Sequence, residues 1–205
     1  MGKGAEAQDG KKPRPPNYAV QLGMAQRLID RAIRMFFEEE DPLFVLAVAN
    51  PGHVLLHDIA HSMLQGGNTV AVMAKRFAEA GMVTDSGKPV RQVSDLLKVL
   101  RRDANSLKHV KETPGVSDES VAATLIVAAN DALTLKAQSG AMMLFAAWAV
   151  ARTENLDQSK WDVAEKLFPC LHQLADPEQK RLGLARLRDT KLVERLGNMA
   201  EEVGA

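Results

Sequence analysis

Apolar residues recur at helical spacing along most of the chain, and turn-forming residues separate these segments. Over 18–40 the apolar side chains fall three or four positions apart, which is typical of one buried helix face. A second helix is expected over about 42–64, because Asp41 is a favoured N-cap residue and Pro42 suits the first helical position. Pro51 should kink this helix, since it removes a backbone donor.

The same pattern predicts six further helices. They are expected over about 70–80, 90–108, 121–138, 142–152, 161–171 and 177–200. The breaks between them fall at Gly, Pro and Ser residues, as at Thr113-Pro114-Gly115. Almost no segment alternates apolar and polar residues, so a sheet is not expected. The sequence therefore predicts an all-α fold, a helical bundle of about seven or eight helices.

The length and charge of the chain bear on its domain organisation. Its 205 residues suffice for one sizeable core and are few for two domains. Residues 1–17 are polar and rich in Lys, Gly and Pro, so we expect a disordered basic tail, with a phosphate-binding arm as the alternative. Residues 18–205 are predicted to form a single helical domain. The formal net charge is zero, which excludes the long-range positive field of a protein that packages DNA.

Cysteine usage and the longest apolar run favour a cytoplasmic protein. Cys170 is the single cysteine, so no intrachain disulfide is possible and a reducing compartment is expected. The N-terminal residues hold no apolar segment of the signal-peptide kind. The longest apolar run, 141–151, is shorter than the roughly 18–20 residues that span a bilayer, so no membrane partner is expected. This run should be buried in the core or against a second copy of the chain.

Residues 88–111 form a basic segment, with seven basic and two acidic residues in a chain of zero net charge. On a helix, residues seven apart lie two turns apart on one face, which aligns Arg102 with His109 and places Asn105 between them. An Arg can hold a phosphate by two parallel hydrogen bonds. A His titrates near neutral pH and can move a proton of a ribose hydroxyl. The segment is a candidate phosphate site, and a solvated basic face is the alternative.

A second candidate is a stripe of three histidines, His53, His57 and His61, spaced four residues apart with Asp58 beside them. Two histidines at this spacing can share one metal ion. No Glu follows the first His, however, and no third ligand is evident elsewhere in the sequence. We therefore predict no metal, and we expect the histidines to line a core, a subunit interface or a ligand site.

Four segments carry a resemblance to a known superfamily. Residues 26–42 (QRLIDRAIRMFFEEEDP) resemble the first helix of microbial proteins that are similar to the HEPN superfamily (higher eukaryotes and prokaryotes nucleotide-binding). Residues 53–58 (HVLLHD) resemble their second helix, and 141–155 resembles a later apolar helix. Residues 105–109 (NSLKH) resemble their Arg-Asn-x-x-Lys-His element, with Ala104 in place of the Arg. The likeness covers about 18–155 and leaves 156–205 as a C-terminal helical extension.

The resemblance implies a HEPN-like homodimer that binds RNA or a nucleotide, with a metal-independent endoribonuclease activity and no cofactor. HEPN ribonucleases use an Arg followed a few residues later by a His, and Arg102 and His109 match these catalytic positions. The ligand-binding candidates are Asn105, Lys108, His57, Asp58 and Arg101. Because Ala104 departs from the motif, a member that only binds is an alternative. A non-catalytic helical scaffold or protein-interaction module is the competing hypothesis.

Overall fold

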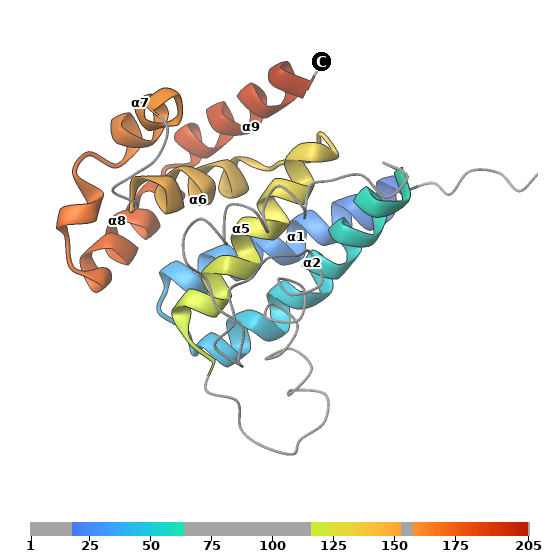
Figure 1. The fold of residues 1–205 in the computed structure, drawn as a ribbon, viewed down its shortest axis with the longest axis horizontal. Coiled ribbons are helices and arrows are strands. Elements are labelled where there is room, and N and C mark those ends of the chain that lie inside the picture. The colour runs from blue at the N-terminus through green and yellow to red at the C-terminus, as the bar shows by residue number, and fades with distance from the viewer. Residues whose placement is uncertain (1–17, 64–115, 153–157, 205) are drawn as a thin grey trace, which may run out of the picture.

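The computed structural model describes residues 18–63, 116–152 and 158–204, and within these ranges the chain is helical with no strand (Figure 1). The all-α prediction is therefore confirmed for the described part of the chain. That part contains seven α-helices and one short 3₁₀ helix, η1. Their bounds are α1 Ala19–Phe37, α2 Pro42–Met63, α5 Asp118–Thr134, α6 Gly140–Ala151, α7 Gln158–Leu167, η1 Leu171–Gln173, α8 Asp176–Arg188 and α9 Thr190–Gly204.

The largest difference from the predicted boundaries lies at the C-terminal end. The single helix expected over 177–200 is two helices, α8 and α9, which meet at Asp189. The Asp189 Oδ1 atom accepts a hydrogen bond from the backbone N–H of Leu192 at 3.1 Å, so this residue caps α9 and interrupts the pattern. The predicted helices over 70–80 and 90–108, and the tail over 1–17, lie outside the described residues.

Three further helices begin where a polar side chain caps them. The Asp41 Oδ1 atom accepts from the backbone N–H of Leu43 at 2.8 Å, as expected at the start of α2. The hydroxyl groups of Ser117 and Ser139 accept in the same way from the first turns of α5 and α6, at 3.3 and 3.1 Å. Pro51 lies inside α2, which continues for three further turns beyond it.

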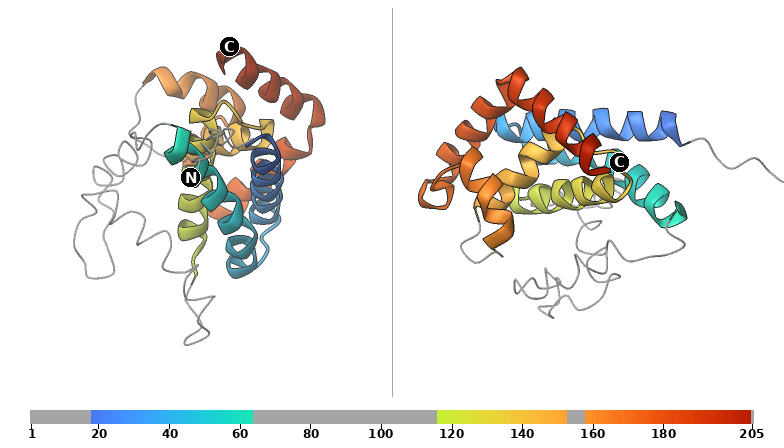
Figure 2. Two further views of the ribbon diagram at one scale, coloured as in Figure 1. Left: turned by 90° about the vertical axis from the view of Figure 1, so that its right-hand side faces the viewer. Right: turned by 90° about the horizontal axis from the view of Figure 1, so that it is seen from above.

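The helices pack as two groups that share one core: α1, α2 and α5 form the first, and α6 to α9 form the second. Helices α1, α2 and α5 lie side by side, and α6 contacts α1, α5 and the C-terminal helices α7, α8 and α9 (Figures 1 and 2). Four aromatic rings join the groups, with centroids 5.2–5.8 Å apart and mostly in edge-to-face contact. These rings belong to Phe36 and Phe37 of α1 and to Phe145 and Trp148 of α6.

The apolar run over 141–151 lies in this core. Met142, Leu144 and Phe145 are fully buried by helices of the same chain. The run was expected either in the core or against a second copy, and its buried face is in the core. The homodimer stays a prediction, but α6 no longer supplies an argument for it.

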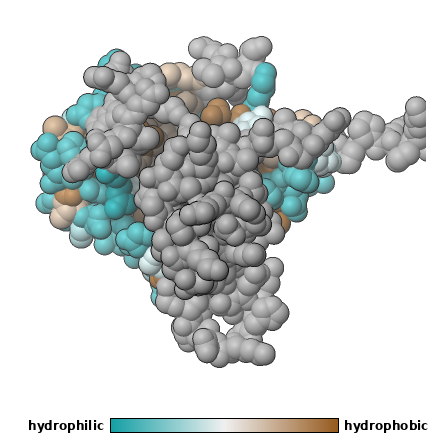
Figure 3. Space-filling model, viewed as in Figure 1, coloured by the Kyte–Doolittle hydropathy of each residue, from teal (hydrophilic) through white to brown (hydrophobic). Residues whose placement is uncertain are grey.

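Helix α2 is long and apolar enough, by length and composition, to cross a bilayer. Core helices of globular proteins meet the same criterion, and α2 packs between α1 and α5. Among the described residues visible in Figure 3, those over α7 and α8 are mostly hydrophilic, with scattered apolar side chains.

Candidate functional site

The five site residues predicted in the basic segment are not placed by the structure. Arg101, Arg102, Asn105, Lys108 and His109 lie outside the described residues. Two further candidates, His57 and Asp58, lie on α2.

The histidine stripe runs from the core to the surface along one side of α2. His53 is buried, the His57 side chain keeps 13% of its surface exposed, and His61 is exposed. The ring centroids of His53 and His57 are 6.1 Å apart, and those of His57 and His61 are 6.4 Å apart with nearly parallel planes. The predicted stripe therefore exists, with His57 at the boundary between core and surface.

A carboxylate of α5 faces the middle of the stripe. The Oδ2 atom of Asp131 lies 3.6 Å from Nδ1 of His57, slightly farther than a hydrogen bond. The Asp131 side chain is wholly buried. The close packing of α5 against α2 creates this pair. A carboxylate in this position can orient the imidazole ring.

The electrostatic environment of Asp131 is unusual for a buried carboxylate. Neither of its oxygens accepts a hydrogen bond from a described residue. Its neighbours along α5, Val127 and Ala128, are buried and apolar. Burying a carboxylate without hydrogen bonds costs folding free energy, and among the described residues the facing imidazole of His57 is its ion-pair partner. The pair is therefore a candidate functional site.

Asp58 does not take part in this arrangement. It is exposed, whereas the neighbouring His57 faces α5. Asp131 was not among the predicted site residues. A signal was present, since this Asp lies within the Ala-rich stretch of α5, where apolar side chains fill the helix. A buried acidic residue in such a stretch needs a partner from another helix.

The described residues offer no evident metal site. No group of three or more His, Cys, Asp or Glu side chains in the described ranges could hold a metal ion. His57 and Asp131 alone would supply two ligands, fewer than the three or four protein ligands of a zinc site. The geometry of the pair favours proton transfer or hydrogen bonding to a ligand.

Comparison with known proteins does not assign this chain to a family. It matches no protein-family model, no curated protein and no solved structure.

Proposed function

We propose that this chain is a HEPN-like protein that binds RNA or a nucleotide, with His57 as a ligand-contacting acid–base group positioned by Asp131. The observation that carries the proposal is the wholly buried carboxylate of Asp131, which accepts no hydrogen bond from a described residue and lies beside a partly exposed histidine. The resemblance of 53–58 and 105–109 to HEPN motifs supports RNA or a nucleotide as the ligand.

The proposed role follows from the two nitrogens of the imidazole ring. Nδ1 of His57 faces Asp131 and is buried. If Nδ1 carries its proton toward the carboxylate, Nε2 is left to accept a proton or, when protonated, to donate a hydrogen bond to a phosphate oxygen. Asp131 would act as a positioning residue. It would not touch the ligand.

Cleavage is the enzymatic form of the same proposal. A metal-independent ribonuclease needs a group that removes a proton from the ribose hydroxyl and one that protonates the leaving oxygen. His57 could take one of these roles, and His109, the predicted catalytic histidine, the other. Arg102 would hold the phosphate by charge-assisted hydrogen bonds.

The test measures binding and cleavage of a labelled single-stranded RNA by the full-length chain. His57→Gln is expected to weaken binding about tenfold, the size of one hydrogen bond to a charged group. Cleavage should fall about a hundredfold or more, because a proton-transfer group contributes at least that much to rate. Binding by the parent protein should weaken as salt rises.

The matched control is His172→Gln, which makes the same chemical change on η1, an element that contacts α6. This variant should bind and cleave like the parent. If the parent shows neither binding nor cleavage, or if the two variants behave alike, the scaffold hypothesis replaces this proposal.

A further inference from the structure

His61 continues the histidine stripe one helical turn beyond His57 and lies at the surface. The centroids of the two rings are 6.4 Å apart, and the ring planes differ by 21°. His61 is exposed, and within the described ranges it forms no hydrogen bond or ion pair. His53, at the other end of the stripe, is buried. The stripe therefore presents two imidazoles, those of His57 and His61, to a ligand.

These two imidazoles have different surroundings. Asp131 faces Nδ1 of His57 and favours a proton on that nitrogen, which leaves Nε2 as an acceptor. No described carboxylate pairs with His61, and this includes Asp58, three residues earlier on α2. An exposed imidazole exchanges protons with water near neutral pH and can give one to a ligand. A proton acceptor and a proton donor thus lie one turn apart.

The spacing of the two rings suits one phosphodiester. Each proton transfer needs a ring nitrogen about 2.6–3.2 Å from an oxygen of the substrate. Rings whose centroids are 6.4 Å apart can reach the attacking and the leaving oxygen at a single phosphorus. The two histidines can therefore act on the same bond.

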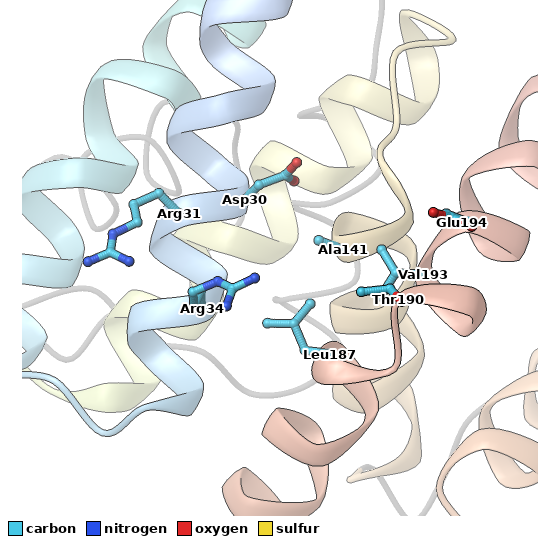
Figure 4. A pocket seen from close by; sticks show the side chains of 8 residues that line it. All are labelled: Asp30, Arg31, Arg34, Ala141, Leu187, Thr190, Val193 and Glu194. Atoms are coloured by element: carbon cyan, nitrogen blue, oxygen red, sulfur yellow. The ribbon is translucent and has the colours of Figure 1, made fainter.

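A cavity between α1 and the junction of α8 with α9 offers no comparable pair (Figure 4). Its volume is about 370 Å³. The charged side chains that line it are those of Asp30, Arg31, Arg34 and Glu194, so two carboxylates balance two guanidinium groups. None of its lining residues is a histidine, the side chain that titrates nearest neutral pH. The histidine stripe is the better candidate for proton transfer.

We propose that His61 is the general acid of RNA cleavage, with His57 as the general base. This inference rests on the proposed function, and it gives His61 the role that the family resemblance suggests for His109. Nε2 of His57 takes the proton of a ribose 2′-hydroxyl, whose oxygen forms a bond to the adjacent phosphorus. The bond from phosphorus to the 5′ oxygen of the next nucleotide breaks, and His61 gives that oxygen its proton. The products are a 2′,3′-cyclic phosphate and a free 5′-hydroxyl.

The test compares cleavage of two RNA substrates by the full-length chain, one natural and one with sulfur in place of the 5′ leaving oxygen. A thiolate leaves without being protonated, so the sulfur substrate needs no general acid. His61→Gln should slow cleavage of the natural RNA about a hundredfold or more, and it should cleave the sulfur substrate at close to the parental rate. His57→Gln should be slow on both substrates, because the 2′ proton must still be removed.

His172→Gln is the matched control and should cleave both substrates like the parent. Equal losses on the two substrates for His61→Gln would overturn the proposal, as would recovery on the sulfur substrate by His109→Gln instead. Binding without cleavage by the parent would also overturn it, but would leave the proposed binding function standing. A parent that neither binds nor cleaves RNA would overturn both.

Discussion

At the scale of single residues, Asp131 and Lys180 show two ways of burying a charge. Asp131 is wholly buried, accepts no hydrogen bond from a described residue and has the ring of His57 opposite it. Lys180 is also buried, but it donates a hydrogen bond to Asp118 and lies 4.7 Å above the ring of Phe36. The contacts of Lys180 offset the free-energy cost of burying its side chain, whereas those of Asp131 with described residues offset less of that cost.

This difference predicts the effect of Asp131→Asn on stability. The substitution keeps the shape and removes the charge, so the free energy of unfolding should stay equal to that of the parent or rise by about 1–2 kcal/mol. RNA or nucleotide binding should weaken at the same time, because His57 loses its positioning group. Urea unfolding measures the first effect. A loss of more than about 2 kcal/mol would mean that the pair is structural.

At the scale of helices, glycines set how closely α6 and α8 approach their neighbours. A Cβ atom on Gly183 of α8 would lie 2.3 Å from the ring of Phe37, and one on Gly140 of α6 would lie 1.9 Å from the carbonyl oxygen of Val193. Such distances are far below van der Waals contact. These two contacts therefore position the C-terminal helices against the core and require glycine.

Gly183→Ala is expected to lower the free energy of unfolding by about 1–3 kcal/mol, because the added methyl group forces the Phe37 ring to move. Gly23→Ala in α1 is the matched control. Its Cβ would meet only the end of the Arg27 side chain, at 3.7 Å, so higher helix propensity should raise stability by up to about 1 kcal/mol. Thermal and urea unfolding of both variants test this, and a destabilised Gly23→Ala would contradict it.

Sequence pattern could predict most of the described helices because they bury apolar faces and turn-forming residues separate them. The cap at Asp41 was evident in this way. The cap at Asp189 was not predicted, because an Asp within an amphipathic pattern does not by itself indicate the end of a helix. The pairing of His57 with Asp131 could not be derived, since it depends on the packing of two helices that are distant in sequence.

At the scale of the whole molecule, a partly buried ion pair links the C-terminal helices to the rest. Lys180 of α8 pairs with Asp118 at the start of α5 and packs over Phe36 of α1. A second pair, Arg152 with Asp176, is much more exposed. The 156–205 extension suggested by the family resemblance is thus packed into the common core where it is described.

The two pairs should differ in their contribution to stability. Asp118→Asn leaves the buried ammonium of Lys180 without its anionic partner, and the expected loss is about 2–3 kcal/mol. Asp176→Asn removes the partner of an exposed Arg152, with an expected loss below about 1 kcal/mol. Each Asp is the first residue of its helix, so both substitutions remove a similar favourable interaction with the helix dipole. Equal losses in urea unfolding would show that burial of Lys180 does not govern the difference.

The homodimer and the cytoplasmic location remain predictions. The proposed role of His57 can be tested by NMR of its imidazole nitrogens. In the free protein, we expect a ring with its proton on Nδ1, toward Asp131. Titration with single-stranded RNA or a nucleotide should shift the Nε2 signal of His57 and leave the ring signals of His172 unchanged. If the ligand saturates the protein while the His57 signals stay in place, or if none of these ligands binds, the account is contradicted.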